Sequence, residues 1–245
     1  MISVRNRALA ALLTLTPAAG LLVGSPAQAA DLAITVKSVS LSKSTLVLGS
    51  KAGCSSVVFT AVLSAPLPTG GEIFSGVGVD IETPSGDNAG IGGAITQVGS
   101  TATYKGPISF CGSGPAGRYT ALVYGVVADK SGDFQTTNVV SKSIYLKRPS
   151  SLTLNATPEP VVKGKKLTAK GTLKVNGKVL SGTPVKIYFK AAGASVYTYK
   201  GTAKTNAKGV YTKAFTATKS GVWKAVYAGG NARNAASAVD AVAVK

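Results

Sequence analysis

Two stretches of this chain, 104 residues apart, share a pattern that decides the fold. Residues 116–125 read AGRYTALVYG, and residues 220–229 read SGVWKAVYAG. Each stretch has a turn glycine, an aromatic residue two positions later, and an alanine two positions after that. Because alternate residues of a β-strand point to one face, the aromatic side chain fills a core and the alanine leaves room across a sandwich. The pattern predicts one strand that recurs in two domains of about 100 residues each.

The rest of the chain has the same β-rich rhythm. Glycines and short polar clusters recur every eight to fifteen residues, between runs rich in Val, Thr, Ile, Tyr and Ala. This spacing is typical of a sandwich or barrel, and no stretch of ten or more residues has an apolar face at helical spacing. The fold class we expect is all-β, with two tandem immunoglobulin-like β-sandwiches after a cleaved signal peptide.

The expected strands follow from these runs, and the dipeptide Asn176-Gly177 predicts a two-residue hairpin. In the first half they are 33–48 (with a break near 42), 56–63, 77–82, 102–110, 118–128 and 139–146. In the second half they are 151–156, 166–173, 185–189, 196–200, 210–217, 222–227 and 236–244.

The first thirty residues are typical of a secretory signal. Arg5 and Arg7 precede an apolar run from Ala8 to Val23, and Ala27-Gln28-Ala29 offers small residues at a cleavage site. The alternative is a membrane anchor. Pro17 interrupts the run, and a spanning segment needs about 20 apolar residues, so the signal is the better interpretation.

Three segments follow from these boundaries. We expect a signal peptide over 1–30, a first domain over 31–148 and a second over 149–245, joined by the polar linker Lys147–Ser151. No later apolar run is long enough to cross a bilayer. The sequence therefore predicts a secreted, extracellular protein without a transmembrane anchor, and any attachment to a cell wall is expected to be noncovalent.

The two cysteines, Cys54 and Cys111, are expected to form a disulfide, because an exported protein meets an oxidising compartment. Closing that loop would stabilise the first domain by about 4 kcal/mol. A redox pair and half of a metal site are the alternatives. Both are disfavoured, since the chain has no histidine and no third sulfur ligand.

Residues 150–245 resemble the bacterial immunoglobulin-like repeats of secreted and cell-surface proteins. The matching segments are 162–164, 171–173, 182–187, 205–211 and 220–229. Such repeats often continue with an acidic residue and a second aromatic, whereas this chain reads Gly230-Asn231-Ala232-Arg233-Asn234. The resemblance implies an immunoglobulin-like fold for residues 150–245. The missing acidic residue in the segment 230–234 argues against ion binding at that place. We expect no cofactor and no metal.

Catalytic chemistry has little support. Histidine is absent, and both cysteines are expected to be paired. The acidic cluster Glu72, Asp80, Glu82 and Asp87 is the one conceivable site of a secreted hydrolase, and solvated carboxylates at a strand end are the simpler interpretation. The loop 129–133 has two aspartates four residues apart, but Lys130 lies between them, so a glycine turn is favoured over a calcium site. We predict that the protein is not an enzyme.

Charge separates the two halves. Residues 31–148 have a net charge of +2, and residues 149–245 have a net charge of +14 from fifteen lysines and one arginine against two acids. Strand alternation places Lys186 and Lys190 opposite Val185, Ile187 and Phe189, facing water. The candidate polyanion-binding residues are Lys186, Lys190, Lys200, Lys204 and Lys208.

Anionic cell-wall polymers, acidic polysaccharides, anionic lipid or stray nucleic acid would suit such a surface. Specific DNA recognition is disfavoured because arginine is nearly absent. A lysine-coated surface that serves only solubility stays open. Our leading hypothesis is a structural or adhesion module that attaches to an anionic envelope polymer through its second domain.

Tyrosines carry the second hypothesis. Tyr197 and Tyr199 share a strand face beside Lys200 and could stack on sugar rings, as in a carbohydrate-binding or accessory module, although such pairs are often core or cross-strand neighbours. Tyr211 and Phe215 also share a face, with Lys213 between them, and simple alternation does not accommodate that lysine.

Overall fold

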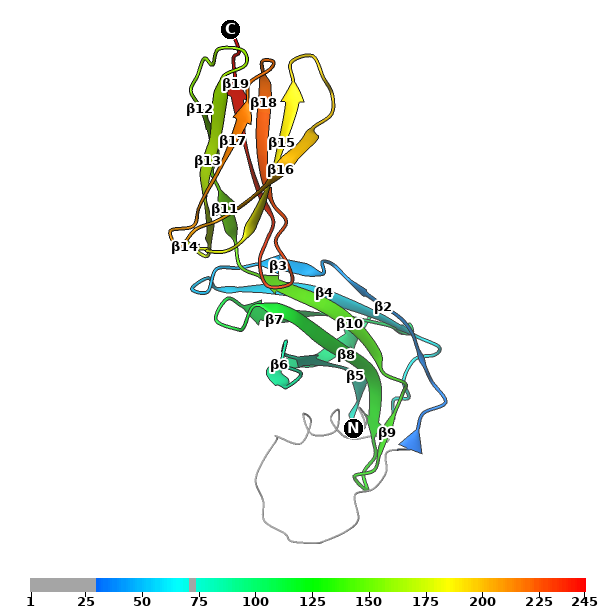
Figure 1. The fold of residues 1–245 in the computed structure, drawn as a ribbon. Helices are drawn as coiled ribbons and strands as arrows, with labels where there is room; N and C mark the ends of the chain where they lie inside the picture. The colour runs from blue at the N-terminus through cyan, green and yellow to red at the C-terminus, as the bar shows by residue number, and fades with distance from the viewer. Residues whose placement is uncertain (1–29, 71–73) are drawn as a thin grey trace. The chain divides into compact units, whose positions relative to one another are not determined.

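The computed structural model describes residues 30–70 and 74–245, and the expected signal peptide lies outside them. The described residues form strands β1 to β19 and no helix, so this part of the chain is all-β (Figure 1). It divides into two compact units. The first contains the residues up to Leu46 and Gly53–Leu146, and the second contains Val47–Ala52 and Lys147–Lys245.

The first unit is an immunoglobulin-like sandwich whose two sheets are joined through one long strand. In one sheet β2 and β7 flank β4, and in the other β8 lies between β5 and β10. The first sheet of this unit contains β2 (Val36–Leu41), β4 (Cys54–Leu63) and β7 (Thr103–Cys111). Its second sheet contains β3 (Thr45–Val47), β5 (Phe74–Glu82), β8 (Gly117–Ala128) and β10 (Val140–Lys147). Two short strands, β1 (Ala30–Asp31) and β9 (Phe134–Thr136), extend the second sheet beyond β8.

The joining strand, β6 (Asn88–Gln97), was not predicted. Its first part pairs with β5, and its last residues Thr96 and Gln97 pair with β7. Gly92 and Gly93 lie in the part of β6 that pairs with β5, opposite Asp80 and Val79, with φ of 150° and 148°. A Cβ on Gly92 would lie 2.4 Å from the carbonyl oxygen of Val79, so the pairing with β5 needs glycine there. The same glycines give the segment little β-propensity, and for that reason the sequence did not predict this strand.

The predicted break near residue 42 is confirmed, since β2 ends at Leu41 and β3 begins at Thr45, in the opposite sheet. The disulfide is also confirmed. Cys54 and Cys111 are bonded and face each other at the paired ends of β4 and β7. The bond therefore joins neighbouring strands of one sheet and does not cross the core between sheets.

A tyrosine at the start of β8 forms the corner that is typical of immunoglobulin-like sandwiches. The Tyr119 hydroxyl donates a hydrogen bond of 2.7 Å to the carbonyl of Pro115, four residues upstream. The ring is buried, at 3% exposure, and packs edge-on against Phe110 with centroids 5.6 Å apart. The contact fixes the turn that leads into β8.

We expect Tyr119→Phe to lower the free energy of unfolding of the first unit by about 1–2 kcal/mol, because the Pro115 carbonyl loses its partner while the ring still fills the core. Urea denaturation followed by circular dichroism measures this. A change within about 0.5 kcal/mol of zero would contradict the assigned role of the hydroxyl.

The second unit is an immunoglobulin-like sandwich of two separate sheets. In one, β13 pairs with β11, β12, β14 and β17, and in the other the order is β16-β15-β18-β19 (Figure 1). The first sheet contains β11 (Ser150–Leu152), β12 (Asn155–Thr157), β13 (Lys166–Val175), β14 (Lys178–Val179) and β17 (Val210–Thr216). The second contains β15 (Pro184–Ala191), β16 (Thr198–Lys204), β18 (Gly221–Tyr227) and β19 (Ala236–Val242).

The repeated pattern occupies the same place in both units. Tyr119 and Trp223 are 3% and 5% exposed, and Ala121 and Ala225 are fully buried. Each pair lies on the core face of its strand, β8 or β18, as predicted. The hairpin at Asn176-Gly177 is also confirmed, since φ is 50° and 78° and Val175 pairs with Lys178.

Lys213 is accommodated by a glycine on the other sheet. Its side chain is half-buried, and its Nζ donates to the carbonyl of Thr202 at 3.2 Å. A Cβ on Gly201 would lie 2.8 Å from Lys213 Cε. Gly201 therefore makes room for the lysine stem, and the ammonium reaches the edge of the sandwich.

Candidate functional site

Five side chains gather on the outer face of the sheet β16-β15-β18-β19. In β15, Val185 and Ile187 are fully buried, so Lys186, Tyr188 and Lys190 point away from the core. Register pairs Tyr188 with Tyr199 of β16 on one side and with Lys224 of β18 on the other. We call Tyr188, Lys190, Tyr197, Tyr199 and Lys224 the tyrosine–lysine face.

Tyr197 holds two lysines together. The Nζ atoms of Lys190 and Lys224 each lie 5.3 Å from the centroid of its ring. A cation–π contact of this kind contributes about 0.5–1 kcal/mol at an exposed site. The ring therefore limits the motion of two long side chains and concentrates positive charge at one place.

The second pair of tyrosines lies beside this cluster. The rings of Tyr188 and Tyr199 meet edge-on with centroids 5.6 Å apart. Tyr199 is 53% exposed, and its hydroxyl hydrogen bonds with Thr202 Oγ1 at 2.8 Å. The face thus offers an exposed aromatic surface next to fixed cations.

The two acids of the second unit lie elsewhere. Asp240 belongs to β19 and accepts a hydrogen bond of 2.7 Å from the backbone N–H of Ala156 at the edge of the sandwich. Partial loss of water contact raises the pKa of the Glu159 carboxyl, and the nearby Asp240 carboxylate raises that pKa further. Register places no carboxylate on the described residues of the tyrosine–lysine face, so its charge is wholly positive.

The five candidate lysines separate into three groups. Lys186 and Lys204 lie on the same outer face as Lys190, since they pair with Thr202 and Pro184 of neighbouring strands. Lys200 is the extra residue at a register shift, and its Nζ lies 6.0 Å from the Phe189 ring, on the core side. Lys208 lies in the turn between β16 and β17. Sequence reasoning missed Tyr188 and Lys224.

The acidic cluster of the first unit does not form a comparable site. Glu72 lies outside the described residues. Asp80 accepts a hydrogen bond of 3.0 Å from the Tyr124 hydroxyl, and burial raises the pKa of its carboxyl. Asp87 bonds with Ser85 in an exposed turn at 2.7 Å. These groups serve local structure.

The loop 129–133 closes on its own aspartate. Asp129 Oδ1 accepts from the Ser131 hydroxyl and from the backbone N–H groups of Ser131 and Asp133. The Ser131 and backbone hydrogen bonds lower the pKa of the Asp129 carboxyl. Across the described residues, no three acidic, histidine or cysteine side chains gather as metal ligands would.

No known protein family matches the sequence, and no curated protein sequence matches it either. Several solved structures are similar. The fibronectin(III)-like modules of Clostridium thermocellum CbhA share 15% identity over 84% of this chain and 95% of theirs, with a TM-score of 0.34.

The D00-D0 domain of intimin shares 15% identity over 85% of this chain and 98% of its own, with a TM-score of 0.29. The native form of E. coli alpha-2-macroglobulin shares 10% identity over 89% of this chain and 14% of its own, with a TM-score of 0.37. In the described part of the chain, no helix has the length and apolar character to cross a membrane.

Proposed function

We propose that this chain is an exported, non-catalytic adhesion or structural module whose second unit binds anionic polymers of the cell envelope. The observation that carries the proposal is the tyrosine–lysine face, where Tyr197 holds Lys190 and Lys224 at 5.3 Å each. Long-range attraction comes from the net charge of +14 over residues 149–245. Lysines whose motion is already restricted then contact the polymer. Because these side chains lose less freedom on binding, the entropy cost of binding is lower.

A flexible polymer with repeated negative charges fits this face better than a compact anion does. Lys186 and Lys204 extend the positive surface along the sheet in one direction from the clustered lysines, toward the start of β15. Successive outward residues of a strand are about 7 Å apart, so several charged groups of one polymer can be contacted together. Each contact is weak and salt-sensitive, and affinity depends on their number.

We expect the chain to be retained on purified cell-wall material at low salt and released as salt rises. The Lys190→Gln, Lys224→Gln double variant should bind about tenfold more weakly, since two fixed contacts are lost. The matched control is Lys166→Gln, Lys170→Gln, which removes the same charge from the exposed face of β13. Sedimentation of the protein with wall material across a salt series measures both effects.

A smaller loss is expected for the control, about two- to threefold, because it lowers only the general attraction. An equal loss in both double variants would remove the special role of the tyrosine–lysine face. Failure to bind wall material even at low salt would overturn the proposal and leave the charge a role in solubility.

Carbohydrate binding is the second candidate, favoured by the exposed ring of Tyr199 beside Tyr188. If sugars stack on these rings, neutral glycans should bind, and their binding should not weaken as salt rises. Loss of glycan-array binding in the Tyr197→Ala, Tyr199→Ala double variant would support it, and an array without signal would exclude it. Because both candidate functions use the same outer face of the sheet, the dependence of binding on salt is what distinguishes them.

A further inference from the structure

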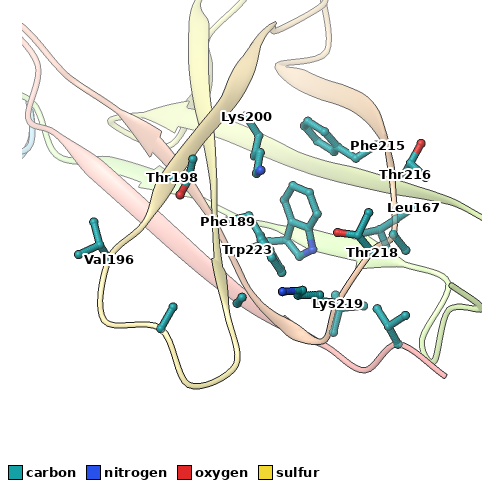
Figure 2. Close-up of a pocket in the computed structure, with 15 residues that line it drawn as sticks. Leu167, Phe189, Val196, Thr198, Lys200, Phe215, Thr216, Thr218, Lys219 and Trp223 are labelled. Carbon is teal, nitrogen blue, oxygen red and sulfur yellow. The ribbon is translucent and has the colours of Figure 1, made fainter. Parts of the chain in front are cut away.

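A hollow of about 370 Å³ opens at the edge of the second unit, between its two sheets. Its walls come from β13, β15, β16, β17, β18 and β19, and from the loops that join β15 to β16 and β17 to β18. Figure 2 shows Trp223 at the centre of this hollow, surrounded by side chains of both sheets. The volume lies in the range of small-molecule sites, roughly 300–1,000 Å³.

The floor of the hollow is aromatic. The Trp223 ring has its centroid 4.8 Å from that of Phe189 and 4.6 Å from that of Phe215. Trp223 is only 5% exposed, while both phenylalanines are half-buried and form the sides. An apolar group that enters here contacts aromatic carbon and displaces water from it.

The charged residues of the lining are Lys200 and Lys219, and the lining contains no carboxylate. Lys200 Nζ lies 6.0 Å from the Phe189 centroid, over the aromatic floor. Figure 2 shows the amino group of Lys200 directed toward the Trp223 ring and that of Lys219 on the other side of the ring in this view. Both side chains are exposed, so their ammonium groups meet water at the mouth while the apolar floor lies beneath.

We propose that this hollow binds a small amphipathic anion. Its hydrocarbon body lies among Phe189, Phe215 and Trp223, and its carboxylate lies between Lys200 and Lys219. The shape of the site selects an apolar body, and its charge selects a negative head over a neutral or positive one. The site is separate from the tyrosine–lysine face because Phe189 and Trp223 point to the other side of the same sheet.

The test uses Trp223, the one tryptophan of the chain, whose fluorescence reports on the hollow directly. The full chain is titrated with octanoate, octan-1-ol and octylammonium, which share a hydrocarbon chain and differ in charge. We expect a saturable fluorescence change with octanoate, and binding at least about tenfold weaker with octylammonium. No saturable change with octanoate, or equal binding of octylammonium, would overturn the proposal.

A variant pair then locates the carboxylate. Lys200→Met, Lys219→Met should weaken octanoate binding about tenfold and leave octanol binding nearly unchanged, because methionine keeps the apolar stem and removes the charge. The control Lys186→Met, Lys204→Met removes the same charge from the outer face and should leave octanoate binding nearly unchanged. Equal losses in the two variants would contradict the placement of the carboxylate between Lys200 and Lys219. Whether the hollow binds an amphipathic anion at all is decided by the three ligands on the unaltered chain.

Discussion

Replacing Cys54 and Cys111 by serine is expected to lower the free energy of unfolding of the first unit by about 4 kcal/mol. The disulfide closes a loop of 57 residues, which contains β5 and β6 and most of β4 and β7. Without it, the unfolded chain gains the conformational freedom of that loop while the folded strands keep their other contacts. In urea the midpoint should fall by roughly 2 M.

The two units can be followed separately in this experiment. Circular dichroism reports the loss of strands throughout the chain, and fluorescence of Trp223 reports the second unit alone. The matched control is Ser56→Ala, Ser109→Ala, which alters the next outward pair on the same two strands, where the hydroxyls lie 2.9 Å apart. We expect the control to cost less than about 1 kcal/mol. A disulfide-free variant as stable as this control would contradict the prediction.

Strand positions were predictable where alternation and turn glycines agree. The stretches 116–125 and 220–229 both become long strands with one aromatic and one alanine in the core. Alternation needs only a period of two residues, and it is independent of the partner strand. For that reason the inward and outward residues of β8, β15 and β18 could be assigned from the sequence.

Strands that depend on distant partners could not be predicted in this way. Residues 88–97 contain three glycines and little β-propensity, yet β6 forms because β5 and β7 offer open edges on both sides. The predicted strand 151–156 is likewise interrupted, since β11 ends at Leu152 and β12 begins at Asn155. Tertiary contact, and not local preference, places these segments.

In the candidate site, too, some features follow from a single strand and others depend on contacts between strands. Outward orientation of Lys186 and Lys190 follows from their own strand, and the structure agrees. Lys200 breaks the pattern because one extra residue opposite Ile187 and Tyr188 reverses the alternation. The neighbours Tyr188 and Lys224 come together only through the register of β15 with β18, which no single strand reveals.

The largest effect of one added methyl group is expected at Gly171, in β13. A Cβ on this residue would lie 1.9 Å from the carbonyl oxygen of Thr153 and 2.5 Å from the hydroxyl oxygen of Tyr211. The Tyr211 hydroxyl donates a hydrogen bond to that same carbonyl, in the break between β11 and β12. Burial raises the pKa of Tyr211, so the hydroxyl stays protonated as the donor. Gly171 thus leaves the space in which the contact forms.

Gly171→Ala is therefore expected to lower the free energy of unfolding of the second unit by roughly 3–5 kcal/mol, because overpacking adds to a lost buried hydrogen bond. The thermal midpoint followed by Trp223 fluorescence should fall by at least about 15 °C. Tyr211→Phe removes the hydrogen bond alone and should cost about 1–2 kcal/mol.

The matched control is Gly230→Ala, in the same unit, where an added Cβ meets no atom within 4 Å. It should change the free energy of unfolding by less than about 0.5 kcal/mol, as a surface substitution does. If Gly171→Ala cost no more than Tyr211→Phe, the Thr153 carbonyl would have to move aside at little cost. The close approach of β13 to the break in its neighbouring strand would then contribute little to stability. Glycine would be needed at position 171 only because it leaves room for the hydrogen bond between the Tyr211 hydroxyl and the Thr153 carbonyl.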